Sequence, residues 1–219
     1  MGVVGVLLMV TAVVVVLDWV AVGTGRARLE AVAKPAVMLG LIAVAVAVLL
    51  AGPDDGAASL SPTVRVGVLV GLLAGLAGDV LLLPQVDRFV PGLVAFLVGH
   101  LGYSAAFLGH GLRTWATLVG ASAAVGLVVA VGLPILHAVR RSRPALVVPV
   151  GCYLVVTGLV VTLAIGSGPA AARVGAVLFA GSDAVLGWAR FVRPVPGGRL
   201  LVMVPYHLGQ ALIVLGLLR

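Results

Sequence analysis

Long apolar stretches, separated by short polar segments, dominate the hydrophobic pattern of the chain. Each stretch is close to the roughly 20 residues with which an α-helix crosses a bilayer core of about 30 Å. Clusters of Pro, Gly, Asp and Arg mark the segments between them. The pattern predicts eight membrane helices, at Val3–Gly23, Val32–Ala51, Val64–Leu83, Phe89–Gly109, Trp115–Val139, Ala145–Ile165, Ala170–Phe191 and Leu200–Leu218. The linker Gly52–Thr63 carries Asp54 and Asp55, and the other linkers are shorter.

Composition supports the membrane class. Of the 219 residues, 62% are hydrophobic and 10% are charged, and the mean hydropathy is +1.28. A soluble domain is nearer to about half apolar and about a quarter charged, so the excess apolar surface must face lipid. We therefore predict an all-α, polytopic membrane protein with one transmembrane domain over residues 1–219. The first stretch follows no basic segment and precedes no clear cleavage site, so we interpret it as a membrane helix.

The net charge of +7 comes mainly from arginines in the linkers, where membrane proteins place them for topology, and it does not indicate nucleic-acid binding. One side of the predicted bundle receives Arg26, Arg28, Lys34, Arg88, Arg140, Arg141, Arg143, Arg190, Arg193 and Arg199. The other side receives Arg65, Arg113, Arg173 and Arg219. The positive-inside rule then predicts a bacterial plasma-membrane protein with both termini outside the cytoplasm. Cys152 is the only cysteine, which excludes an intrachain disulfide.

Three local matches recur in order between the two halves of the chain. Lys34-Pro35-Ala36 resembles Arg143-Pro144-Ala145, Asp79 with Leu82 resembles Asp183 with Leu186, and His100-Leu101-Gly102 recurs as His207-Leu208-Gly209. The matches fall in predicted helices two and six, three and seven, and four and eight. Because four helices separate the partners, they run in the same direction. The matches predict two parallel four-helix repeats, with halves 1–112 and 113–219.

Acidic residues inside apolar helices are costly, at roughly 2.5–3.5 kcal/mol on insertion scales. Four of the seven acids are predicted in loops: Glu30, Asp54, Asp55 and Asp87. Asp18 is expected as an interfacial acid beside Trp19. Asp79 and Asp183 stand in otherwise apolar helices, after small residues that allow another helix to approach closely. A structural hydrogen bond to a neighbouring helix would explain one such acid, but two at matching positions favour a functional site.

Lys34 is the only lysine in the chain, and it precedes Pro35 at the predicted start of the second helix. One interpretation is an interfacial cation that extends toward the lipid head groups. The other is a counter-ion, either of a substrate phosphate or of one of the two buried acids. The sequence leaves both open.

Further polar side chains lie on the fourth and eighth predicted helices. His100 and Tyr103 are three residues apart and share a face, and Tyr206 and Gln210 are four apart and share a face. Such residues often form hydrogen bonds between membrane helices. The histidines are scattered, and no H-E-x-x-H motif occurs, so no metal site is predicted. No nucleophile elbow or phosphate-binding loop occurs at a suitable place.

The motifs together resemble the YhhN family of lysoplasmalogenase-like membrane proteins. The resemblance is carried by Lys34-Pro35, by Gly78-Asp79-Val80-Leu81-Leu82, by Phe89-x2-Gly92-x3-Phe96-x3-His100-x2-Tyr103, by the run 175–183 that ends in Gly181-Ser182-Asp183, and by Tyr206-x3-Gln210. It covers nearly the whole chain, from the second predicted helix to the eighth.

This resemblance implies eight membrane helices and hydrolysis of the vinyl-ether bond of lysoplasmalogens, with no metal or organic cofactor. The implied partners are a lysophospholipid substrate and membrane lipid. Asp79 and Asp183 match the motif positions of a catalytic pair. Substrate-binding positions are implied at Lys34, His100, Tyr103, Ser182, Tyr206 and Gln210.

Vinyl-ether hydrolysis requires one protonated carboxylic acid, which protonates the β-carbon, and one ionised carboxylate, which stabilises the cation and activates water. The sequence does not decide which aspartate has which role. Lys34 would hold the substrate phosphate as a point charge. The alternative function is a small-solute or proton-coupled transporter, because such proteins also combine repeats with intramembrane acids. A third interpretation is a lipid-binding scaffold without turnover.

Overall fold

The computed structural model describes residues 2–51 and 60–218, and within them the chain is helical, with no strand. The helices are α1 (Val3–Gly23), α2 (Ala27–Leu50), α3 (Pro62–Leu81), α4 (Phe89–Leu108), α5 (Thr114–Leu127), α6 (Leu133–Ser142), α7 (Val147–Ser167), α8 (Ala170–Phe191) and α9 (Gly198–Leu217). Eight helices in the described part are long and apolar enough to cross a membrane, with α5 and α6 counted as one. This confirms the predicted all-α membrane class. Asp54, Asp55 and Arg219 lie outside the described residues.

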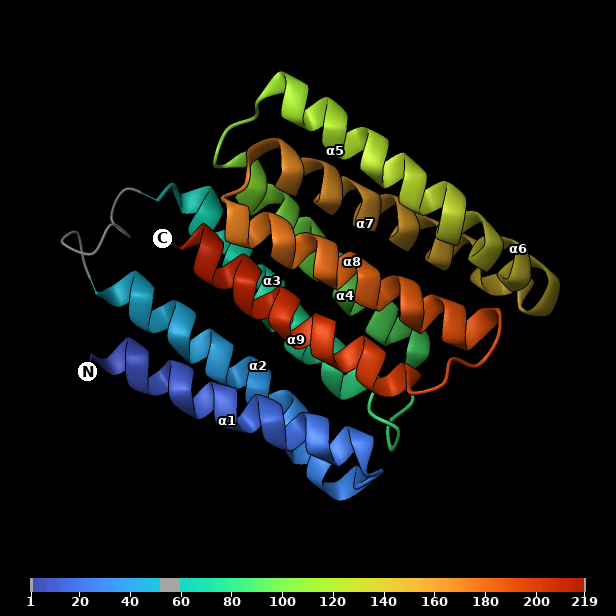
Figure 1. Cartoon of the computed structure of the whole chain (residues 1–219), viewed down its shortest axis with the longest axis horizontal. Coiled ribbons are helices and arrows are strands. Elements are labelled where there is room, and N and C mark those ends of the chain that lie inside the picture. Colours follow the sequence, from blue (N-terminus) through green and yellow to red (C-terminus); the bar gives the residue numbers. More distant parts are fainter. Residues whose placement is uncertain (1, 52–59, 219) are drawn as a thin grey trace.

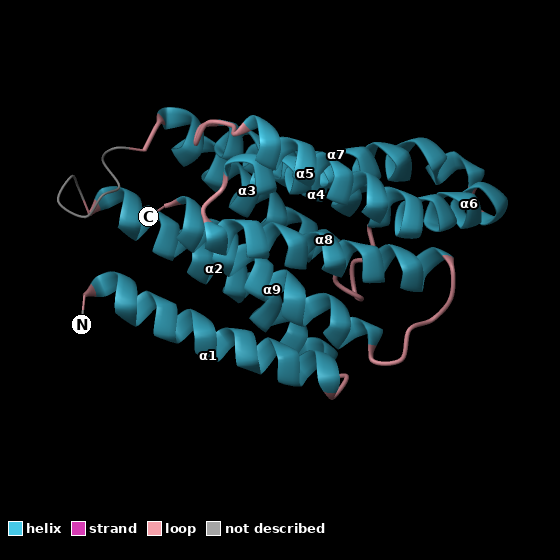
Figure 2. Cartoon of the chain, turned by 45° about the horizontal axis from the view of Figure 1, so that its top comes forward, coloured by secondary structure: helices cyan, strands magenta, loops and turns pink. Residues whose placement is uncertain are grey.

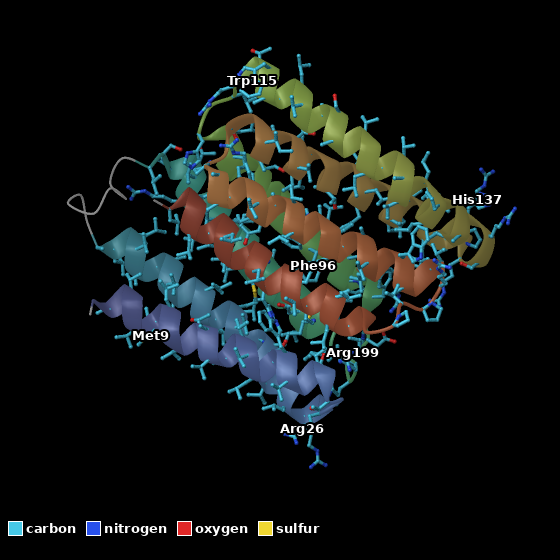
Figure 3. All side chains as sticks on the ribbon, in the orientation of Figure 1. Met9, Arg26, Phe96, Trp115, His137 and Arg199 are labelled. Atoms are coloured by element: carbon cyan, nitrogen blue, oxygen red, sulfur yellow. The ribbon has the colours of Figure 1, made fainter. Side chains whose placement is uncertain are left out.

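Successive helices alternate in direction across the bundle (Figure 1). Helix α1 begins and α9 ends at the same end of the molecule, and the loop between α8 and α9 lies at the other end. Helix α1 forms one edge, against α2, and α5 forms the opposite edge, against α7 (Figures 1 and 2). The edge helices expose apolar side chains such as Met9 and Trp115, whereas Phe96 lies in the middle of the bundle (Figure 3). The exposed apolar edges are what a lipid-facing surface requires.

Helix α2 begins at Ala27, five residues before its predicted start at Val32. Pro35 therefore lies inside the helix and not at its first turn. The first turn instead consists of good helix formers and includes Glu30, whose negative charge is favourable at a helix N-terminus. Glu30 is consequently a buried helical residue, and its predicted place in a loop was wrong.

The predicted fifth helix, Trp115–Val139, is extended to Thr114–Ser142 and changes its winding on the way. Residues Val128–Gly132 form a π-helical segment between α5 and α6. Pro134 is the second residue after this segment and has no N–H to offer to the preceding turn. Wider turns before a proline relieve the clash of its ring with the helix, which accounts for the π-helical winding.

Close glycine contacts join α3 to α4 and α8 to α9. A Cβ atom added to Gly67 would lie 2.5 Å from the carbonyl oxygen of Gly102, and one added to Gly175 would lie 2.7 Å from that of Gly209. The backbones thus touch where only hydrogen atoms fit, as small residues permit between membrane helices. The two contacts involve the third and fourth helix of each proposed half. The duplication itself stays a prediction, and side chains from both halves pack in one core.

We expect Gly67→Leu to force α3 away from α4, because the contacted atoms are backbone atoms that cannot rotate away. Overpacking of this kind costs about 1–3 kcal/mol or more. Thermal unfolding in detergent should therefore shift to lower temperature. Gly126→Leu is the matched control, since no described atom lies within 4 Å of a Cβ added there. Equal stability of the two variants would contradict the close contact.

Candidate active site

Asp79 lies near the end of α3 and is completely buried. Its Oδ1 atom is 3.3 Å from the Nζ atom of Lys34 on α2, which is also buried. Its Oδ2 atom accepts a hydrogen bond of 2.8 Å from the hydroxyl of Tyr206 on α9. Gly75, one turn earlier on α3, leaves room for these groups, because an added Cβ would lie 2.9 Å from the Cε atom of Met38. An ammonium group and a phenol thus both stabilise Asp79 as a carboxylate.

A chain of hydrogen bonds orients the Tyr206 hydroxyl. Tyr103 on α4 donates to the Oε1 atom of Gln210. Gln210 in turn offers its Nε2 atom to the Tyr206 oxygen at 3.4 Å. Because the Tyr206 oxygen accepts from this side, its own hydrogen is free to point toward Asp79. The chain of contacts links three helices, α4, α9 and α3.

Asp183 on α8 has a different set of partners. Its Oδ2 atom accepts a hydrogen bond of 2.9 Å from the hydroxyl of Tyr153 on α7. The same atom lies 3.2 Å from the Nε2 atom of His100 on α4. Its side chain keeps 12% of its surface exposed, whereas Asp79 keeps none.

The ring orientation of His100 constrains the proton between these two groups. Its Nδ1 atom lies 2.8 Å from the carbonyl oxygen of Phe96, which can only accept. Nδ1 must therefore carry a hydrogen. If His100 is neutral, its Nε2 atom then has a lone pair and no hydrogen, so the contact with Asp183 needs a proton from the carboxyl group. A hydrogen bond between Nε2 and Oδ2 therefore needs one shared proton, carried as histidinium with carboxylate or as imidazole with carboxylic acid.

Both aspartates line one cavity of about 570 Å³. Phe96 and Phe179 also line it, and their rings pack against the residues that contact the carboxyl groups. The Phe96 and Tyr206 ring centroids are 5.8 Å apart, and those of Phe179 and His100 are 4.6 Å apart. An aromatic wall therefore lies beside both carboxyl groups, and a bound molecule in the cavity would be accessible to both.

The predicted substrate-binding residues divide into two groups. Lys34, Ser182 and Tyr206 line the cavity. The hydroxyl of Ser182 also donates to the carbonyl oxygen of Val202 at 2.9 Å, which ties α8 to α9. His100, Tyr103 and Gln210 are not among the lining residues. His100 contacts the lining residue Asp183, Gln210 contacts the lining residue Tyr206, and Tyr103 reaches the wall only through Gln210. For all six, substrate contact stays a prediction.

Three participants were missed by sequence reasoning. Tyr153 stood in an apolar helix with no motif around it, although all three tyrosines of the chain turn out to be buried and hydrogen-bonded at this site. Glu30 and Arg199 form an ion pair at the cavity. Arg199 had been interpreted as a topology signal alone. The rarity of tyrosine in so apolar a chain was the available signal for Tyr153.

Asp18 was expected at the interface, and this was wrong, because its side chain is fully buried. Its Oδ2 atom lies 3.9 Å from the Nδ1 atom of His207, which accepts a hydrogen bond of 3.2 Å from the indole N–H of Trp19. His207 matches His100 in the proposed repeat. Among the described residues, however, it forms no ion pair or hydrogen bond with Asp79 or Asp183. The histidines thus have different surroundings in the two halves.

The described side chains at the cavity do not form a metal site. In residues 2–51 and 60–218, no three His, Cys, Asp or Glu side chains lie together in an arrangement that could hold a metal ion. The groups present at the cavity are instead suited to moving a proton and holding an anion.

Two comparisons with known proteins, one with family models and one with individual proteins, agree with each other. A model described as the YhhN family matches residues 29–217. The human protein named Lysoplasmalogenase TMEM86B is 33% identical over 131 residues, which is 60% of this chain and 54% of that protein. Bovine Lysoplasmalogenase TMEM86A is 31% identical over 159 residues, 68% of this chain and 63% of that protein. The aligned part thus spans less than two thirds of these relatives. No solved structure matches.

The Lys34–Asp79 ion pair predicts a non-additive effect on stability. Removing one partner of a buried pair costs about 3–5 kcal/mol, because the other charge is left without compensation. We expect Lys34→Met and Asp79→Leu each to lower the unfolding temperature in detergent, and the double variant to be more stable than the less stable single variant.

Asp87→Asn serves as the control, because its ion pair with Arg190 joins atoms 3.7 Å apart at the surface. Exposed pairs of this kind contribute about 0–1 kcal/mol. Strictly additive losses in the double variant would show that the buried pair carries no coupling energy.

Proposed function

Since the chain belongs to the YhhN family, we propose that it is a membrane-embedded hydrolase that cleaves the vinyl-ether bond of lysoplasmalogens. The observation that carries the proposal is one cavity lined by two carboxyl groups in different hydrogen-bond surroundings. Curated relatives are named lysoplasmalogenases, which supports the same substrate class. The products would be a fatty aldehyde and a glycerophospho-head group.

The reaction needs an acid and a base at one substrate. A proton adds to the β-carbon of the vinyl ether, and the electrons of the double bond form the new C–H bond. The remaining oxocarbenium ion is attacked by water at its α-carbon, and the water loses a proton. The resulting hemiacetal breaks its carbon–oxygen bond to the glycerol and forms an aldehyde and an alcohol. The net change is addition of one water molecule.

We assign the acid to the Asp183–His100 pair. With Nδ1 of His100 donating to the Phe96 carbonyl, a hydrogen bond between Nε2 and Asp183 needs one shared proton, which is the proton that the reaction would use. Once the proton has left, the Asp183 carboxylate faces a lone pair on His100, which favours the return of a proton. The pair is therefore suited to donating a proton and then recovering one. Tyr153 positions the carboxyl group through its hydrogen bond.

We assign the carboxylate role to Asp79. Lys34 and the Tyr206 hydroxyl stabilise its charge. Asp79 lines the cavity, so its carboxylate would take a proton from water bound there. A fixed negative charge beside the oxocarbenium ion would also lower the energy of the transition state.

We further infer that the loops between α1 and α2 and between α3 and α4 face the cytoplasm. The larger set of basic residues gathers at this end of the bundle. Cavity residues such as Pro84, Gly197 and Arg199 belong to the same end. A lysolipid would then be taken from the cytoplasmic leaflet, with its phosphate near Lys34 and Arg199.

Substitution of either aspartate should abolish most of the turnover, since loss of a positioned acid or base costs about 10²–10⁴-fold in rate. Aldehyde release from lysoplasmalogen would be measured with purified, monodisperse Asp79→Ala and Asp183→Ala variants. We expect added formate to restore part of the activity of Asp79→Ala only, because it can supply a carboxylate beside Lys34.

Asp87→Asn is the matched surface control and should keep full activity. Rescue of Asp183→Ala but not of Asp79→Ala would reverse the two assignments. Full activity of both alanine variants would overturn the reaction mechanism. Solute movement by the wild-type protein in liposomes, with no aldehyde released from any lysoplasmalogen, would instead favour a transporter.

Orientation can be read from cysteine labelling in a Cys152→Ser background. An impermeant maleimide added to intact cells should label Leu112→Cys, in the loop before α5, and should spare Val86→Cys, in the loop before α4. Both native side chains are exposed, at 49% and 40%. Permeabilised cells should show labelling at both positions. The opposite pattern in intact cells would place the termini in the cytoplasm.

A further inference from the structure

A narrow apolar slot of about 60 Å³ adjoins the larger cavity, between α4, α7, α8 and the π-helical segment. Its walls include Leu93, Val131, Ile135 and Leu154. The slot and the cavity have four lining residues in common: Leu82, Phe96, Asp183 and Leu186. Asp183 therefore lies at the junction where the apolar slot meets the larger, more polar cavity.

We propose that this slot binds the first carbons of the lysolipid's hydrocarbon chain beyond the vinyl ether, and that it thereby holds the vinyl ether at Asp183. The inference rests on the proposed function for the identity of the lipid. The occupant is a single hydrocarbon chain, because the slot is lined mainly by aliphatic and aromatic side chains. Its polar lining residues are Thr157, Tyr153 and Asp183, and the last two are hydrogen-bonded to each other at the junction.

The order of groups along a lysoplasmalogen agrees with the order of groups along the two spaces. The molecule runs from phosphate through glycerol, ether oxygen, α-carbon and β-carbon to the chain. The protein runs from Arg199 and Lys34 through Asp79 to Asp183 and then into the slot. A chain in the slot brings the β-carbon to Asp183, the assigned proton donor. The α-carbon then lies on the side of Asp79, the assigned base.

The π-helical segment shapes one wall of the slot. Val128, Val131 and Gly132 of this segment line it, together with Leu127 of the preceding turn. The wider winding departs from the regular α-helical placement of side chains, and such segments are frequent at functional sites.

The slot positions the chain but contributes little free energy of binding. Lipid tails are as apolar as leucine, so a methylene group gains little when it leaves the bilayer for the slot. What the slot can do is exclude chains that do not fit, by steric overlap with its walls. Selectivity should therefore appear as a dependence of turnover on the carbons next to the vinyl ether and on the size of the wall residues.

The test compares two valines of the same segment. Val131 lines the slot, whereas Val129 is 57% exposed on the outside and is not a lining residue. Val131→Phe should lower kcat/KM for a sixteen-carbon alkenyl lysolipid by about tenfold or more relative to the two-carbon vinyl analogue, which has no further carbon to place in the slot. Val129→Phe should leave this ratio unchanged. An unchanged ratio in both variants would overturn the proposal.

Photo-crosslinking gives a readout that does not depend on turnover. The probe is an alkyl-ether lysolipid, which has no vinyl-ether bond, with a diazirine on the chain close to the ether oxygen. In the wild-type protein the label should map to peptides of the π-helical segment and α7, and Val131→Phe should reduce it. Labels confined to outward residues such as Val129 and Val155 would overturn the slot assignment. Slot labelling without aldehyde release from any vinyl-ether substrate would retain the slot and reject the hydrolase.

Discussion

The need to pair a buried carboxylate inside an apolar bundle organises much of this structure. Asp79 has no exposed surface, so its charge is tolerable only because Lys34 and Tyr206 contact it. These partners bring α2 and α9 against α3. The Tyr206 hydroxyl is in turn oriented through Gln210 and Tyr103. One carboxyl group thus determines the contacts of polar residues on four helices.

The second carboxyl group, that of Asp183, has different contacts. Asp183 has a histidine and a tyrosine as partners where Asp79 has an ammonium group and a tyrosine. A histidine can share its proton with a carboxyl group, whereas an ammonium ion mainly neutralises one. In the proposed mechanism, the site therefore combines one group that gives a proton with one that keeps a negative charge. This difference is the chemical basis of the proposed hydrolysis.

The two halves of the chain contribute to the site in a crossed manner. His100 lies in the first half and contacts Asp183 in the second, while Tyr206 lies in the second half and contacts Asp79 in the first. The close glycine contacts of α3 with α4 and of α8 with α9 allow the backbones to approach closely enough for such crossings. Neither half would complete a carboxyl site alone.

The membrane class, the all-α fold and the eight helices follow from the sequence, because apolar stretches of bilayer length depend only on local composition. Asp79 and Asp183 were also identifiable, since a charge in such a stretch is costly wherever it lies. The burial of Asp18 and Glu30, the place of Tyr153 and the assignment of roles were not. They depend on which helices meet and at what height, and residues far apart in the chain decide this. Only the tertiary structure places His100 beside Asp183 and Lys34 beside Asp79, and those neighbours determine where a proton can reside.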